Sequence, residues 1–173
     1  IVLDLHADYE PLLHIYTQPA AWPEAQDLAA ELDARAVLLA DVAGCEPFDE
    51  ACSTPWHTLK EIQSDAAIPP ACFSATVELR SNNDVSMNYA RDDARARLRF
   101  LTRRGLIKGN VGDAPRLLCE ATDLRAMQQV KAPCEGVVDY KLRLGDRVRT
   151  GDVIAEIIPE AGDIAEVTAT TIS

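Results

Sequence analysis

The stretch IVLDLH at residues 1–6 is the part of this sequence from which the fold can be predicted. Its apolar start is typical of a buried β-strand, and Asp4 and His6 place a carboxylate and an imidazole where that strand ends. Open α/β folds hold their functional groups at the carboxyl ends of strands. The stretch therefore predicts a sheet whose rim could bind a metal. Because the chain begins inside this strand and lacks an initiator Met, we expect it to be a piece of a longer protein.

Composition and charge exclude several classes of protein. Of the 173 residues, 47% are hydrophobic and 5% are aromatic, so we expect a packed, largely aliphatic core. No apolar stretch approaches the roughly 20 residues that cross a bilayer. The net charge of −11 lies in residues 1–83, which hold 14 acidic and 3 basic residues. This acidic half argues against nucleic acid or a membrane as partner, and it is compatible with a cation site or with a solvated acidic surface.

The cysteines indicate a reducing compartment. Their number is odd and none forms a CxxC pair, which excludes a disulfide framework and a zinc ribbon. We therefore expect reduced thiols, mostly buried as small hydrophobes, in a cytoplasmic protein. The five positions are Cys45, Cys52, Cys72, Cys119 and Cys134.

Strands and helices alternate over about the first 110 residues. The apolar periodicity and the positions of proline and glycine predict a loop over 7–22, a helix from Pro23 to about Asp33, a strand over 36–40 and a loop over 41–46. A helix over about 48–65, which Pro55 should kink or restart, and a strand over 72–79 follow. A long helix then runs from a cap at Asp84 to Arg104 and is ended by Gly105. Such an order predicts an α/β fold with a mostly parallel sheet.

The sequence changes character after this region. Short apolar segments at 116–121, 125–131, 136–142 and 153–158 alternate with Gly-Asp turns and predict a small β module. We therefore divide the chain into an α/β domain, residues 1–113, and a β module, residues 114–173. VKAP at 130–133 is echoed by VTAT at 167–170, shortly before the chain stops, so we expect the module to be truncated at its end.

Three segments, taken in order, resemble a known family. DLH at 4–6, TVELR at 76–80 and residues 132–159 are similar to the C-terminal portion of the succinylglutamate desuccinylase/aspartoacylase family, which belongs to the zinc carboxypeptidase-like metallohydrolases. The resemblance covers nearly the whole chain. It implies a partial carboxypeptidase-like sheet with helices, followed by a module that resembles half of a biotinyl/lipoyl-type barrel. Residues 159–166, where a carrier domain would hold its modified lysine, contain no Lys, so we reject a swinging-arm role.

The resemblance also implies the roles of two residues. His6 matches the family's later zinc ligand, and Glu78 matches its general base. The family's other two ligands form a His-x-x-Glu pair, which is absent because none of His6, His14 and His57 has Glu three residues on. The Arg and Asn side chains with which the family binds the substrate carboxylate have no counterpart either. Two of the three metal ligands are therefore expected outside this chain.

The function implied for the parent protein is a zinc-dependent deacylase. Such an enzyme would hydrolyse the amide bond of a small N-acyl amino acid or similar substrate with metal-activated water. For this chain alone we expect weak or no zinc binding and no catalysis. The alternative is a non-catalytic binding or regulatory module on the same scaffold. Missing upstream strands would leave an open sheet edge, which favours association between copies.

The residues around the proposed ligand and base each have a second interpretation. His6 could be an ordinary strand-end histidine, and Glu78 could form a surface ion pair with Arg80. If the strand continues, Asp4, His6 and Asp8 share one face, so either acid could orient the imidazole. For Asp8 we favour a loop acid near the sheet rim over a direct metal ligand.

Three further features are weaker candidates. Tyr16, near His14 in the predicted loop, could donate a hydrogen bond to substrate, or either side chain could pack in the core or lie on the surface. Arg80 could steer an anionic substrate, although an exposed structural role is the simpler interpretation. His57 receives no role. The arginines of the helix over residues 91–104 are expected to form a solvated, salt-paired face.

Overall fold

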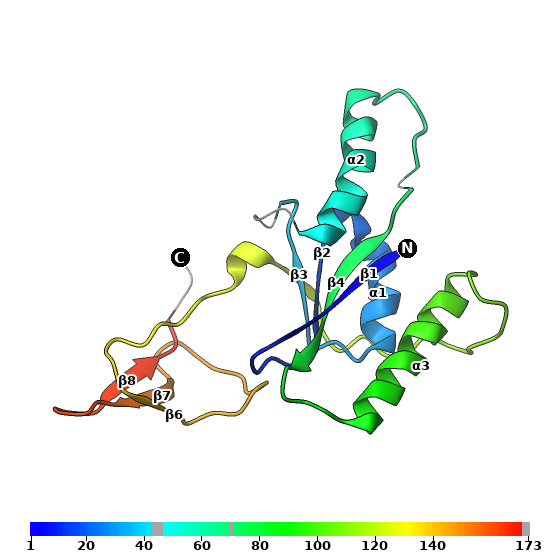
Figure 1. The fold of residues 1–173 in the computed structure, drawn as a ribbon. Helices are drawn as coiled ribbons and strands as arrows, with labels where there is room; N and C mark the ends of the chain where they lie inside the picture. Colours follow the sequence, from blue (N-terminus) through cyan, green and yellow to red (C-terminus); the bar gives the residue numbers. More distant parts are fainter. Residues whose placement is uncertain (43–46, 70, 171–173) are drawn as a thin grey trace. The chain divides into compact units, whose positions relative to one another are not determined.

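The computed structural model describes residues 1–42, 47–69 and 71–170 (Figure 1). The chain divides into two units, Ile1–Leu124 and Arg125–Ser173. The predicted loop over 41–46 lies largely outside the described residues, as do Cys45 and Pro70. None of the helices in the described ranges is both long and apolar enough to cross a lipid bilayer.

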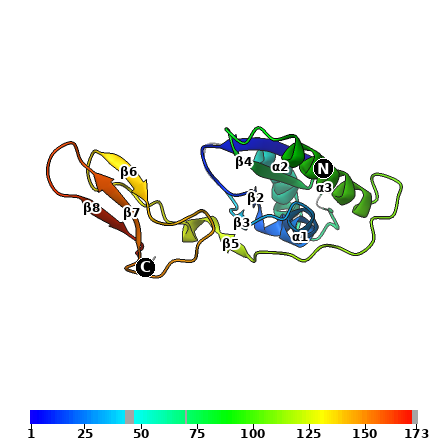
Figure 2. The same cartoon turned by 90° about the horizontal axis from the view of Figure 1, so that it is seen from below.

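A five-stranded, mostly parallel sheet forms the centre of the first unit, which confirms the predicted fold class. Its strands are β1 (Val2–Asp8), β2 (His14–Thr17), β3 (Ala36–Leu39), β4 (Ser74–Ser81) and β5 (Ala121–Asp123). They lie in the order β1-β4-β2-β3-β5, with β1 at one edge and β5 at the other (Figure 2). Only the β4–β2 pair is antiparallel.

Strand β2 corrects the prediction of a loop over 7–22. The four residues His14–Thr17 pair with both β4 and β3, and the 3-10 helix η1 (Pro19–Ala21) follows. The segment is too short, and too polar on one face, to show the periodicity of a strand. Its place between two longer strands supplies the backbone hydrogen bonds that hold it extended.

The two faces of the sheet differ in what covers them. Helices α1 (Trp22–Glu31) and α3 (Met87–Arg103) pack with the apolar face, where Leu28, Val77 and Phe100 are fully buried. Because side chains alternate along β4, the neighbours of Val77, Thr76 and Glu78, point to the opposite face. The first turn of α2 (Phe48–Ile62) lies over that second face, where Ser74 Oγ donates to Asp49 O at 2.7 Å.

The observed ends of the helices agree only in part with those predicted from the sequence. Helix α2 runs through Pro55 as one element, so the predicted restart is wrong; Pro55 is exposed, and water can reach the carbonyl that it leaves free. Helix α3 begins after Ser86, whose hydroxyl accepts from the Tyr89 N–H at 3.4 Å. The predicted cap, Asp84, instead accepts the Ser81 N–H and closes the turn after β4. Gly105 ends α3 as predicted, with a φ of 75°.

A β-bulge interrupts the pairing of β1 with β4 shortly before both strands end. The register shifts between His6 and Asp8, and Arg80 takes a φ of 92°, which costs a non-glycine residue about 1–3 kcal/mol. The Arg80 guanidinium holds this conformation by donating two hydrogen bonds to Asp93 on α3, at 2.7 and 3.0 Å, and by stacking over the Tyr89 ring at 4.4 Å. The bulge therefore turns Arg80 away from the face that holds Glu78.

Replacing Asp93 with Asn should destabilise the first unit by about 2 kcal/mol, because it leaves the Arg80 guanidinium without its charged partner at a buried site. Urea unfolding followed by tryptophan fluorescence measures this loss, since Trp22 and Trp56 both lie in the first unit. Asp92→Asn, at an exposed position on the same helix, is the matched control and should change stability by less than about 0.5 kcal/mol. Equal losses in the two variants would contradict the role assigned to the pair.

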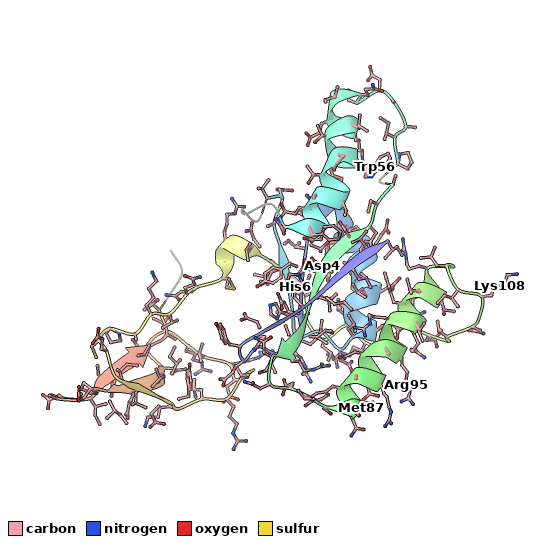
Figure 3. All side chains as sticks on the ribbon, viewed as in Figure 1. Asp4, His6, Trp56, Met87, Arg95 and Lys108 are labelled. Carbon is pink, nitrogen blue, oxygen red and sulfur yellow. The ribbon has the colours of Figure 1, made fainter. Side chains whose placement is uncertain are left out.

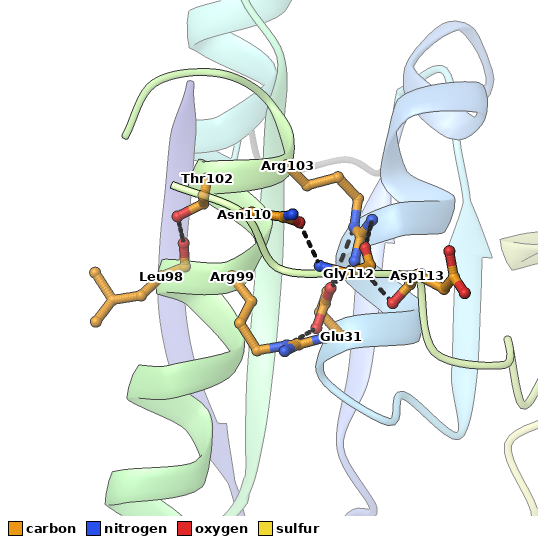
Figure 4. Close-up of polar contacts among 8 residues, drawn as sticks. All are labelled: Glu31, Leu98, Arg99, Thr102, Arg103, Asn110, Gly112 and Asp113. Carbon is orange, nitrogen blue, oxygen red and sulfur yellow. Dashed lines mark hydrogen bonds and ion pairs between the residues drawn. The ribbon is translucent and has the colours of Figure 1, made fainter. Parts of the chain in front are cut away.

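The arginine-rich helix is only partly the solvated face that was predicted. Arg95 and Asp92 form an exposed pair, as expected. Arg99 and Arg103, in contrast, converge on Glu31 of α1, with shortest N–O distances of 2.7 Å to each of its carboxylate oxygens (Figure 4). The Glu31 side chain is only 1% exposed and the Arg99 side chain is 41% exposed, so the cluster joins α1 to α3 through a buried carboxylate that is reached from the surface.

The second unit contains a three-stranded antiparallel sheet of β6 (Val137–Tyr140), β7 (Val153–Ile158) and β8 (Ala165–Thr168). Its buried core consists of Ala155, Ile157 and Val167. The predicted Gly-Asp turns are present: the carboxylate of Asp152, for example, accepts the Arg149 N–H at 2.7 Å. The half-barrel resemblance stays a prediction.

The boundary between the two units lies after Leu124, later in the chain than the boundary predicted from the sequence after residue 113. Residues 114–124, placed in the β module by that change, belong to the first unit, where β5 pairs with β3. The predicted strand over 125–131 is absent, because the 3-10 helix η2 (Leu124–Ala126) and irregular structure occupy that segment.

The four described cysteines are free thiols, as predicted, but none is fully buried. Cys52, Cys72 and Cys119 are partly exposed and Cys134 is exposed. Burial, with a smaller contribution from Glu120, raises the pKa of the Cys119 thiol.

Candidate active site

Register across the sheet brings the predicted site residues together. His6 on β1 is paired with Glu78 on β4, and Glu78 is paired in turn with His14 on β2. In the adjacent row, Asp4 pairs with Thr76, and Thr76 pairs with Tyr16. Residues far apart in the sequence therefore form two neighbouring polar rows on the face opposite the apolar core.

His6 lies between two carboxylates. Its Nε2 is 3.0 Å from Asp4 Oδ2, and its Nδ1 is 3.7 Å from Glu78 Oε1. In Figure 3 the Asp4 and His6 side chains lie together on β1. Because a carboxylate only accepts, Asp4 assigns the proton of the neutral imidazole to Nε2, and Nδ1 then presents a lone pair. This is the arrangement in which a carboxylate orients a histidine for a metal.

Glu78 is the least satisfied polar group of this region. Its side chain is 13% exposed, and its Oε2 atom is buried without a hydrogen-bond partner. The ion pair with Arg80 considered from the sequence does not form, since Arg80 bonds Asp93. Burying a carboxylate oxygen without a hydrogen-bond donor costs free energy. A bound ligand, a proton or a cation at this position would offset that cost.

A pocket of about 310 Å³ opens in front of these residues. Its walls come from β1, β2, β3, β4 and the start of α2, all within the first unit. The lining residues are His6, Tyr16, Thr17, Leu38, Ala40, Pro47, Asp49, Glu50, Thr76, Glu78 and Leu124.

Tyr16 lines this pocket from strand β2 and contacts His14. The His14 Nδ1 is 2.8 Å from Leu12 O, and its Nε2 is 3.3 Å from the Tyr16 hydroxyl. The two rings meet edge to face, with their centroids 5.1 Å apart. Burial, followed by the charges of Glu78 and Asp8, raises the pKa of Tyr16, so the phenol stays neutral at ordinary pH.

Two of the predicted candidates lie elsewhere. Asp8 does not line the pocket, and its Oδ1 accepts the Tyr9 N–H at 2.6 Å. Arg80 is likewise not a lining residue. Thr17, Asp49 and Glu50 line the pocket without having been singled out; the two acids at the start of a predicted helix were the available signal, but only the fold shows that this helix end faces the sheet.

The described residues supply part of a metal site. Nowhere in the described ranges do three His, Cys, Asp or Glu side chains gather closely enough to hold a metal ion. The Nδ1 lone pair of His6, backed by Asp4 and facing a carboxylate, has the chemistry of one zinc ligand. A complete site would need donors in addition to these.

Comparisons with solved structures give the fold a context. A succinylglutamate desuccinylase/aspartoacylase family protein from Shewanella amazonensis matches with a TM-score of 0.84 and 24% identity, over 98% of this chain and 47% of that one. A protein of the same family from Shewanella frigidimarina gives 0.81 and 23%, over 98% and 46%. One from Rhodobacter sphaeroides gives 0.63 and 18%, over 99% and 50%. No family model and no curated protein sequence matches the chain.

The chain therefore has the fold of about half of a succinylglutamate desuccinylase/aspartoacylase family protein, consistent with a C-terminal portion. This confirms the resemblance drawn from the three sequence segments. The chain spans about half the length of the structures that it matches.

Proposed function

We propose that this chain is part of a zinc-dependent deacylase, a protein that cleaves the amide bond of a small N-acyl amino acid or similar substrate. The observation that supports this best is the buried, partnerless Oε2 of Glu78 in a pocket wall, beside an imidazole whose other nitrogen is held by Asp4. The structures that share the fold carry the names of deacylases, which agrees with this chemistry.

Each residue of the pair has a role in this proposal. Asp4 holds the His6 ring in one orientation and one tautomer, which leaves Nδ1 as the donor atom for zinc. Glu78 Oε2 accepts a proton from the attacking water and returns it to the nitrogen of the leaving amine. The products are then a carboxylic acid and a free amine. When bound, zinc supplies a Lewis acid and lowers the pKa of water.

Partial burial of Glu78 suits this role. Because no N–H donor occupies Oε2, its lone pairs remain available to accept a proton from water. The nearby Tyr16 stays protonated and adds no charge to the site. The alternative, a non-catalytic binding module on the same scaffold, uses the same pocket but needs neither a base nor a metal.

Zinc binding separates these two functions. In the longer protein, we expect about one zinc per chain after dialysis, and His6→Gln should lower zinc affinity at least 100-fold because it removes a direct ligand. Metal analysis by mass spectrometry measures both. His57→Gln, on α2 and outside the pocket, is the control and should retain the metal. A zinc-free longer protein, or equal zinc in the two variants, would remove the proposal in favour of the binding module.

A further inference from the structure

We infer that the part of the longer protein that covers strand β1 brings a carboxylate side chain to the guanidinium of Arg97. Such a contact would help to join the two halves of that protein, and it is independent of the proposed deacylase activity. One donor on helix α3 is buried without a partner, and among the described strands only β4 covers the neighbouring strand β1.

The unpaired donor is the Nη1 atom of Arg97. It is buried and has no hydrogen-bond partner, and no described carboxylate forms an ion pair with the guanidinium. A guanidinium keeps its charge at every ordinary pH, so it cannot avoid the cost of burial by losing its proton. An acceptor from outside the described residues would remove this cost.

Neighbouring arginines show which acceptor suits such a position. Arg80 pairs with Asp93, and Arg103 pairs with Glu31, each with a shortest N–O distance of 2.7 Å. A pair between two charged groups is stronger than a hydrogen bond to a neutral carbonyl. A carboxylate is therefore the expected partner of Arg97.

Two contacts of helix α3 locate Arg97 along the sheet. Asp93 accepts from Arg80 near the end of β4. The centroid of the Phe100 ring lies 5.7 Å from that of Phe73, which directly precedes β4. The helix therefore runs back along β4, and Arg97 lies between these two contacts. This central part of β4 is the part that pairs with β1.

Arg97 lies on the flank of α3 that faces away from α1. Residues two apart in a helix lie on opposite sides, because 3.6 residues make one turn. Arg99 reaches Glu31 of α1, so Arg97 points the other way. Helix α1 contacts β2, and β1 lies on the far side of β4 from β2. The flank with Arg97 therefore lies toward β1, at the edge of the sheet.

Strand β1 is uncovered on this side. Among the described strands it pairs with β4 alone. Leu5 lies on the same side of β1 as Leu3, which packs against the core, but Leu5 is 47% exposed. Proteins normally cover or pair the edge strands of their sheets. The exposed leucine and the unpaired guanidinium thus indicate one segment that covers both.

That segment belongs to the rest of the longer protein rather than to a second copy of this chain. This chain covers about half of the structures that it matches, so a protein of their length has a second half available to cover β1. A second copy packed about a twofold axis at this edge would bring its own Arg97 to the same place. It would add a cation where an acceptor is missing.

Hydrogen–deuterium exchange of the β1 amides tests this contact, measured by mass spectrometry on the 173-residue chain and on the longer protein. Arg97→Met keeps an apolar stem and removes the charge. In the longer protein it should speed exchange in residues 1–8 about tenfold or more, because the covering segment loses an ion pair at a buried site. In the 173-residue chain, where Nη1 has no partner, the same change should leave exchange unaltered.

Arg95→Met is the matched control, because Arg95 lies on the same helix but its side chain is 72% exposed (Figure 3). It should leave exchange in both proteins unchanged. Arg97→Lys should restore part of the protection in the longer protein, since it returns the charge without the planar group that bonds a carboxylate through two N–H donors.

A double-mutant cycle identifies the carboxylate. Each Asp and Glu of the upstream half is changed to Asn or Gln, alone and together with Arg97→Met. We expect one such acid whose effect on β1 exchange disappears once Arg97 is Met. Equal effects of Arg97→Met and Arg95→Met in the longer protein, or no coupled acid, would overturn the inference. An oligomer of the 173-residue chain that Arg97→Met dissociates, as seen by light scattering, would also overturn it, because a second copy would then be the occupant.

Discussion

Changing Glu78 to Gln is expected to lower the kcat of the longer protein by about 10²–10⁴-fold, the usual contribution of a positioned general base. Gln has nearly the same size and keeps the pocket wall, but its amide cannot accept the proton of the attacking water. The loss should appear in kcat with little change in KM, because Glu78 is assigned to proton transfer rather than to substrate binding. Steady-state hydrolysis of an N-acyl amino acid, with product measured by chromatography, gives both parameters.

Two controls separate chemistry from structure in this experiment. Glu160→Gln removes an exposed carboxylate of the second unit and should leave kcat unchanged. Stability is the second control: the Glu78 variant should be at least as stable as the original, because it removes a buried negative charge whose Oε2 has no partner. Retained activity, or a destabilised Glu78→Gln protein with activity reduced only in proportion to its folded fraction, would exclude Glu78 as the base.

The second large effect is expected at a site far from the pocket. Glu31→Gln should destabilise the first unit by about 3 kcal/mol, more than a hundredfold in its folding equilibrium, because Arg99 and Arg103 lose a charged partner that is 1% exposed. The larger part of this cost should come from Arg103, whose side chain is 17% exposed, because the Arg99 side chain is 41% exposed and water can solvate it. Urea unfolding followed by tryptophan fluorescence measures this change.

The pH dependence of the same variant gives an independent check. Burial by itself would raise the pKa of Glu31, but the hydrogen bonds and charges of Arg99 and Arg103 outweigh it and lower that pKa below its ordinary value. A lowered pKa in the folded state means that the stability is present above the ordinary pKa and is lost as pH falls through the folded one. The difference between original and variant should therefore shrink in acid.

Glu24→Gln is the matched control, since Glu24 also lies on α1 and pairs with Arg104, the residue that caps the end of α3, but near the surface. It should cost less than about 1 kcal/mol. If the two Gln variants were equally stable, the Glu31 cluster would have no special role in joining the helices.

Much of the first unit could be predicted from the sequence because its elements are long or continuously apolar. The strand that contains His6, the helix that starts near Pro23 and the helix that ends at Gly105 all have strong local signals. Strand β2 has none, since its four residues include His14 and Tyr16 and resemble a loop. The sequence could therefore suggest Tyr16 as a substrate contact, but it could not predict that strand β2 forms a wall of the pocket.

The sequence by itself determined the strand that contains Asp4 and His6, the acid at Glu78, and the order of segments that resembles the family. These are local properties, because periodicity and residue type act over a few neighbours. Only the tertiary structure decided which groups meet. Sheet register placed Glu78 between His6 and His14, and an irregularity near the end of β4 turned Arg80 toward Asp93. Strand register and the choice of ion-pair partner depend on residues distant in the chain, and no local pattern specifies them.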